Sequence, residues 1–143
     1  MDRGAGCKEC GVLLVEALCQ RYRVPNAFRE LAVLVTRYHV DAFRIREMRT
    51  ETVLEKLEAL DAFRRPERFG QFLLACEADA RGRRGFEDRD YPQAVYFRSV
   101  FQAAADIDIP SLVARGLQGE NMAMAVRDQR ISAVKHMMAG NGK

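Results

Sequence analysis

Apolar residues recur at intervals of three and four along most of this 143-residue sequence, and prolines and glycines divide the pattern into short blocks. This spacing places apolar side chains along one face of an α-helix, whereas a half-buried strand would need strict alternation. The sequence therefore predicts an all-α fold, an irregular bundle of about six or seven helices with no sheet. The expected helices cover residues 11–23, 26–38, 52–63, 66–82, 92–105, 110–116 and 120–138.

Each expected helix has an apolar face that should point into the bundle. Cys19 and Cys76 lie on such faces and are expected to be buried as small hydrophobic side chains. Leu14 and Leu18 would widen the inward face of the first helix. Other residues expected to face inward include Val12, Tyr22, Phe28, Tyr38, Val95, Val100, Met124 and Val134.

Local signals mark several helix ends. Pro66 and Pro92 suit the first position of a helix, where the missing N–H costs nothing. Thr52 and Glu55 have the spacing of a capping box, in which each side chain bonds the other residue's backbone N–H. The run His39-Val40-Asp41 is expected to close the helix over residues 26–38.

Residues 76–93, CEADARGRRGFEDRDYPQ, join the end of one apolar helical pattern to the start of the next. Gly82 tolerates a positive φ and can end the first helix, while Phe86 is the strongest apolar anchor between the two. The segment is also rich in arginine and acidic residues. It predicts either an ordered, charged connector or a solvated loop whose charges offset one another.

Composition narrows the class of protein but does not identify a function. At 143 residues, 48 % hydrophobic and 30 % charged, the chain is large enough for one globular domain with a real core. No apolar run approaches the roughly 18 residues that would span a bilayer, and no signal peptide is evident, so a cytoplasmic protein without a membrane partner is expected. The formal net charge is only +3, but the cations are 19 arginines against 4 lysines. Arginine suits phosphate contacts, although a GC-rich genome would also enrich it.

Five motifs in order resemble one family. RGRRGFEDRDYPQ (residues 81–93) is similar to an "RGRxGFExxxYPQ" segment of bacterial CCA-adding tRNA nucleotidyltransferases of the class with a central HD domain. VEALCQRYRVPN (15–26), RELAVLV (29–35), LDAFRRPER (60–68) and CEADARGR (76–83) resemble the same region of those enzymes. The resemblance implies the C-terminal third of such an enzyme, with residues 1–49 as the end of the HD region and residues 50–143 as a helical body and tail, together one compact unit.

What the resemblance implies is tRNA binding without catalysis by this chain alone. The helices would hold the acceptor and TΨC arms of tRNA while a separate nucleotidyltransferase head adds C, C and A to the 3′ end. Paired aspartates holding two metal ions, which nucleotidyl transfer needs, are not evident on any strand of this sequence. No cofactor is therefore expected for this chain, whereas Mg²⁺, and Ni²⁺ or another divalent metal at the HD site, are implied for the full-length family.

Six arginines are the candidate phosphate contacts. Arg81, Arg83 and Arg84 follow the expected helix over residues 66–82, and Arg64, Arg65 and Arg68 lie at its start. A straight helix would separate the two clusters by roughly 24 Å, at ~1.5 Å per residue. That separation could follow a nucleic-acid backbone, but both clusters could equally be solvated helix ends.

His39 and Asp41 are weak candidates for metal ligands. Their position resembles the last histidine and aspartate of the HD region, but Val40 intervenes, and the remaining ligands of the family would lie upstream of Met1. An independent HD-type metal phosphohydrolase is thus a distant alternative. A nearer one is a non-catalytic scaffold remnant, which would expose an apolar patch on the first two helices and self-associate through it.

Overall fold

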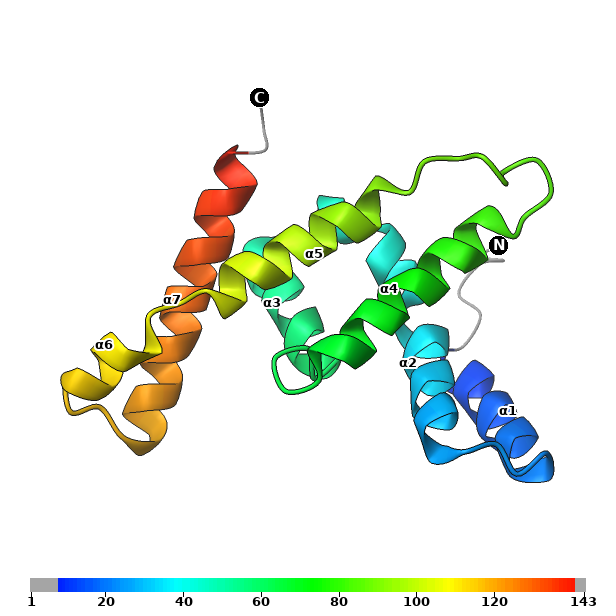
Figure 1. Cartoon of the computed structure of the whole chain (residues 1–143), viewed down its shortest axis with the longest axis horizontal. Coiled ribbons are helices and arrows are strands. Elements are labelled where there is room, and N and C mark those ends of the chain that lie inside the picture. Colours follow the sequence, from blue (N-terminus) through cyan, green and yellow to red (C-terminus); the bar gives the residue numbers. More distant parts are fainter. Residues whose placement is uncertain (1–7, 141–143) are drawn as a thin grey trace, which may run out of the picture.

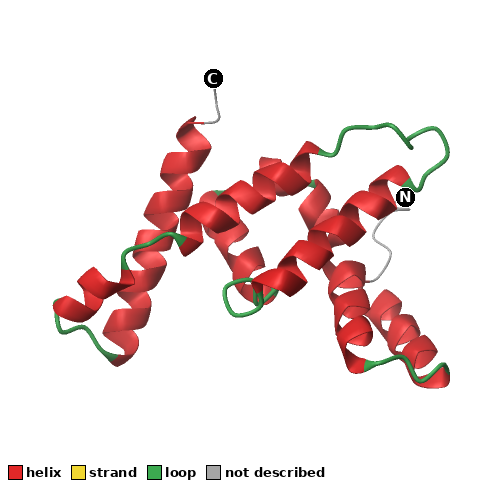
Figure 2. Cartoon of the chain, viewed as in Figure 1, coloured by secondary structure: helices red, strands yellow, loops and turns green. Residues whose placement is uncertain are grey.

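The computed structural model describes residues 8–140, and every regular element in that range is helical (Figures 1 and 2). This confirms the predicted all-α class. The helices are α1 (Lys8–Arg21), α2 (Asn26–Phe43), α3 (Thr50–Ala59), α4 (Pro66–Arg81), α5 (Pro92–Ala105), α6 (Ile109–Ala114) and α7 (Gly119–Gly140), with a short 3₁₀ helix, η1 (Ile45–Glu47), between α2 and α3.

The helices form an elongated assembly rather than a closed bundle (Figure 1). The central part consists of α3, α4, α5 and the C-terminal half of α2. Helix α7 packs across α5 and α3 at one end and carries α6, whereas α1 packs against α2 at the other end. An elongated shape leaves much of each terminal helix exposed to solvent.

The core lies where α3, α4 and α5 meet. Phe72, Phe97 and Leu57 are almost completely buried there. Phe69 adds aromatic contacts, because its ring meets that of Phe97 edge-on at 5.1 Å and that of Phe101 at 5.2 Å. Edge-to-face pairs are favourable beyond their apolar area. This aromatic cluster fixes α4 against α5, and so fixes both ends of the segment that joins them.

The same core cluster includes Ala42 from the end of α2 and Ile45 from η1, together with residues of α3, α4, α5 and α7. The proposed division at residues 49 and 50 stays a prediction. Its outermost parts, residues 1–7 and 141–143, lie outside the described residues.

Several predicted helix ends need correction. Helix α2 continues to Phe43 because Ala42 extends its buried face, so His39 lies inside the helix rather than closing it. Helix α3 begins at Thr50 with no side-chain cap, so the capping box predicted from Thr52 and Glu55 is wrong. Pro66 and Pro92 do begin α4 and α5, as predicted.

The inward faces were predicted correctly in the middle of the fold and less well at its ends. Cys19 and Cys76 are buried, as are Val12, Val100 and Val134. The predictions for Leu14, Leu18, Tyr22, Phe28, Val95 and Met124 are wrong, since each of these side chains is more than half exposed. Except for Val95 on α5, these residues lie toward the ends of the molecule, where the helices have few neighbours to cover a second apolar stripe.

Candidate nucleic-acid interface

The segment between α4 and α5, residues 82–91, is an ordered connector that leaves one end of the molecule and returns to it (Figure 1). The N–H of Phe86 donates to the carbonyl of Arg83, and the N–H of Arg89 donates to that of Phe86. Gly85 has a φ of +87°, which a residue with a Cβ rarely adopts. Gly82, by contrast, has a φ of −70°, so the positive φ predicted for this segment occurs three residues later.

Arg81 stabilises the connector from within. Its Nε donates to the carbonyl oxygen of Arg89 at 3.1 Å, and its Nη2 lies 3.1 Å from Oε1 of Glu77, one helical turn back. A guanidinium can make both contacts at once because its donors form a planar fork. Arg81 therefore closes the connector into a loop, which leaves it less able to bind a phosphate than the sequence suggested.

Arg83 and Arg84 are exposed on this loop, and their side chains make no hydrogen bond or ion pair with another described residue. Nearby, the backbone N–H groups of Glu87 and Gly85 hold the pKa of the Glu87 carboxyl below its usual range. Ordered backbone thus presents two arginines with unused donors. This is the arrangement that a phosphate contact needs.

The C-terminal end of the connector is anchored in the protein interior. The ring of Tyr91 is buried, and burial raises the pKa of its hydroxyl, with smaller contributions from the neighbouring Cys76 and Asp79 side chains. Gln93 Nε2 donates to the carbonyl oxygen of Phe43 at 3.3 Å, which joins the start of α5 to the end of α2. The connector is consequently anchored to three helices.

A cavity of about 610 Å³ lies beneath the connector, between the C-terminal ends of α2 and α4 and the start of α5. We call it the connector cavity. Two partly exposed rings, Phe43 and Phe86, contribute to its wall. It also brings His39 together with Arg81 and Arg83, residues that the sequence had assigned to separate sites. Sequence reasoning missed this cavity because its walls come from segments some 50 residues apart. In the sequence, the nearest signal was Phe43, an aromatic residue shortly after the expected helix over residues 26–38.

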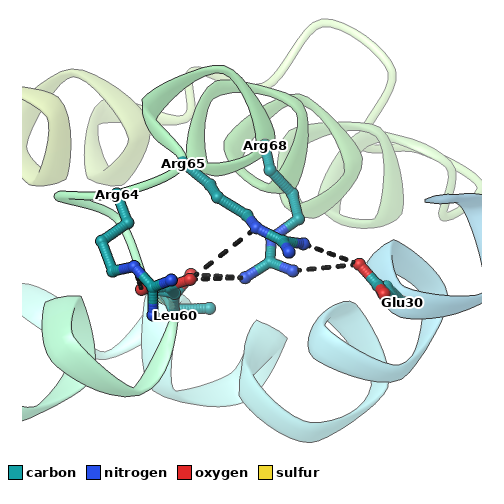
Figure 3. A network of polar contacts seen from close by, with 6 residues as sticks. Glu30, Leu60, Arg64, Arg65 and Arg68 are labelled. Carbon is teal, nitrogen blue, oxygen red and sulfur yellow. Dashed lines mark hydrogen bonds and ion pairs between the residues drawn. The ribbon is translucent and has the colours of Figure 1, made fainter.

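The second arginine cluster, at the start of α4, is largely committed to internal ion pairs (Figure 3). Nη1 of Arg65 lies 2.9 Å, and Nη1 of Arg68 lies 3.3 Å, from Oε2 of Glu30 on α2. Arg68 also donates to the carbonyl oxygen of Leu60 at 3.2 Å, and its side chain is only 18 % exposed. These two arginines fasten α4 to α2 and to the turn before it.

Asp61 organises this turn. It adopts a positive φ of 53°, which aspartate tolerates better than most residues, and its carboxylate lies 3.8–3.9 Å from the guanidinium nitrogens of Arg64, Arg65 and Arg68. Arg64 is the exception in the cluster, with a side chain that is 84 % exposed. Of the second cluster, Arg64 is therefore the residue most available to an external phosphate.

His39 and Asp41 do not face a common site with further ligands. Nδ1 of His39 hydrogen-bonds the carbonyl oxygen of Val35 at 2.8 Å. Asp41 lies 3.1 Å from the ammonium groups of both Lys8 and Lys56. Burial alone would raise the pKa of Asp41, but hydrogen bonds to the two lysines outweigh it and hold that pKa below its usual range. Within residues 8–140, no three His, Cys, Asp or Glu side chains gather as a metal site would require.

Fold and surface together define a small helical domain that displays arginines from a loop at a helix end. Comparison with known proteins gives the class: over nearly its whole length the chain is similar to multifunctional CCA proteins. It is 52 % identical over 134 residues to the one of Thioalkalivibrio sulfidiphilus, which covers 94 % of this chain and 33 % of the relative. It is 55 % identical over 130 residues to that of Nitrosococcus oceani, covering 91 % of this chain and 32 % of the relative, and 46 % identical over 133 residues to that of Pseudomonas aeruginosa.

The chain is thus a homologue of one region of the multifunctional CCA proteins, which confirms the resemblance read from its motifs. It spans about a third of the length of these relatives. No protein-family model matches the chain, and no solved structure does. None of the described helices is long and apolar enough to cross a membrane.

Proposed function

We propose that this chain is the C-terminal, tRNA-binding helical portion of a CCA-adding tRNA nucleotidyltransferase. The observation that supports it most is the homology to multifunctional CCA proteins, together with an ordered connector that presents Arg83 and Arg84. The connector lies within the motif that first indicated the family. It would contact the tRNA acceptor and TΨC arms in the cytoplasm.

Recognition would be by backbone shape. Double-stranded RNA has a major groove too deep and narrow for side chains to read, so proteins contact its phosphates and 2′-hydroxyls. Arg83 and Arg84 would bind phosphates directly, with Arg64 as a second point of contact. Arg81 would act indirectly by holding the loop, and Arg65 and Arg68 by holding α4 on α2.

No described residue is assigned a chemical step. Nucleotide addition with its Mg²⁺, and an HD-type phosphohydrolase activity with Ni²⁺ or another divalent metal, would fall to the two thirds of the relatives' length that this chain does not match. A nucleotidyltransferase head is accordingly the protein partner we propose.

The test is binding of intact tRNA across a salt series, with an acceptor-stem minihelix lacking the elbow as the control RNA. The proposal predicts tighter binding of intact tRNA and a linear fall of log K with log salt, because each neutralised phosphate releases counterions. Equal affinity for both RNAs, or no binding at 50 mM salt, would refute it.

A scaffold that packs through the end formed by α1 and α2 is the second candidate. Leu14 and Leu18, one turn apart on α1, are 72 % and 56 % exposed, and Phe28 on α2 is 66 % exposed. Exposed apolar side chains of this kind are typical of a surface that another protein covers. On this reading, the chain would self-associate when nothing else covers that face.

A further inference from the structure

We propose that the connector cavity binds the base of one unpaired nucleotide, with the phosphate of that nucleotide on Arg83. The proposal rests on the proposed RNA-binding function and names the part of an RNA that this site would take. A cavity of about 610 Å³ lies within the usual size range of sites for small organic ligands, roughly 300–1,000 Å³. Paired bases inside a duplex could not enter it, so the ligand would be a base that is free to leave its stack.

The aromatic walls favour a flat ligand. Phe43 and Phe86 both line the cavity, yet they are 49 % and 40 % exposed, although large apolar side chains are usually covered. Phe86 stays exposed even though the guanidinium of Arg89 lies 5.1 Å from its ring centre. Stacking of a base on such a ring is tolerant of base identity, because every base has a π-face.

The arginines on the cavity wall differ in whether their guanidinium groups already have a partner within the protein. Arg81 is held by Glu77 and by the carbonyl oxygen of Arg89, and the Arg89 guanidinium lies 5.1 Å from the ring centre of Phe86. Arg83 makes no such contact with another described residue, so its guanidinium is the available donor for a phosphate.

The remaining polar side chains of the cavity wall can meet the hydrogen-bonding edge of a nucleobase. Asp79 and Asp90 are exposed carboxylates on the wall, and they can accept hydrogen bonds from the amino groups of a base. Burial, followed by the charge of Asp79, raises the pKa of Cys76 to about 12, so this thiol stays neutral and unreactive at pH 7. His39 also lines the cavity, and its Nδ1 hydrogen-bonds the carbonyl oxygen of Val35.

The experiment titrates 2-aminopurine ribonucleoside 5′-monophosphate with the whole chain, because 2-aminopurine fluorescence falls when the base stacks on an aromatic ring. The expected result is saturable quenching. Phe43→Leu and Phe86→Leu should each weaken binding by at least about fivefold, the loss of one stacking contact. Matched controls on α2, outside the cavity, are Phe28→Leu and Arg29→Gln, which should leave binding unchanged.

The phosphate is tested separately with the unphosphorylated 2-aminopurine riboside. Arg83→Gln should weaken binding of the monophosphate but not of the riboside. Quenching that does not saturate, or that is equally strong in the Phe43→Leu and Phe86→Leu variants, overturns the proposal. Circular dichroism melting of each variant shows that the fold is intact. Binding of tRNA without mononucleotide binding would support the proposed function and refute this site. Binding of the mononucleotide without tRNA binding would support this site and refute the proposed function.

Discussion

The arginines of this chain are of two kinds: some hold the fold together through internal contacts, and others face outward. Arg81 belongs to the first kind, since both of its contacts are internal. We expect Arg81→Gln to lower global stability by only about 0.5 kcal/mol, because the ion pair is half exposed. Amide hydrogen exchange of residues 82–91 should nevertheless rise severalfold. Arg81→Lys should behave like Arg81→Gln, because lysine keeps the charge but lacks the fork; protection equal to wild type in Arg81→Lys would contradict this.

The depressed pKa of Asp41 determines the direction in which the folding stability changes with pH. Its pKa is depressed in the folded state, so its contribution to stability is present above the unfolded pKa of about 3.9 and is lost as the pH falls through the lower folded value. Asp41→Asn should therefore be less stable than wild type at pH 7, by about 1 kcal/mol, and the difference should shrink below pH 4. Thermal melts between pH 3 and pH 7 measure it. A difference that is constant over this range would exclude the ion pairs as its cause.

At the scale of elements, α7 is held by one buried side chain and a set of arginine contacts. Val134 is fully buried. Nη1 of Arg127 lies 2.7 Å and 2.6 Å from the two carboxylate oxygens of Glu58 on α3, and the guanidinium of Arg130 lies 3.6 Å from the ring centre of Phe63. The two arginine contacts fix α7 against α3 and the turn that follows it, and α7 also packs against α5.

The buried side chain should matter most for this docking. We expect Val134→Ala to cost about 1.5 kcal/mol of unfolding free energy, from the apolar area lost. The matched control Val113→Ala, on the exposed side of α6, should cost less than about 0.5 kcal/mol. Urea unfolding measures both variants. Equal effects would mean that α7 does not dock as described.

The starts of α4 and α5 and much of the central core could be predicted from the sequence because their causes are local. Pro66 and Pro92 begin helices through their own geometry, and the stripe around Val100 repeats with the helical period. The roles of Arg65 and Arg68 could not be predicted, because their partner Glu30 lies 35 and 38 residues away. The same holds for the connector cavity, which depends on Gln93 meeting Phe43. Phe28 and Val95 were misassigned because a helical pattern does not say which faces have a neighbour.

For the whole molecule, the question is whether the exposed apolar face formed by α1 and α2 mediates self-association. Leu18→Glu should abolish any self-association through this face, because a charge cannot be buried unpaired. Light scattering over a concentration series, with Val113→Glu at the other end of the molecule as the control, measures it. An oligomer that survives Leu18→Glu would place the interface elsewhere.

Binding of tRNA by the connector is tested by the affinity of intact tRNA for the Arg83→Gln/Arg84→Gln variant, measured over a salt series. The matched control is Arg29→Gln/Arg98→Gln, which removes the same charge from exposed arginines on α2 and α5. We expect weaker binding by the connector variant and a slope of log K against log salt that is shallower by about one to two, with the control close to wild type. Equal affinities and slopes for the two variants would contradict it.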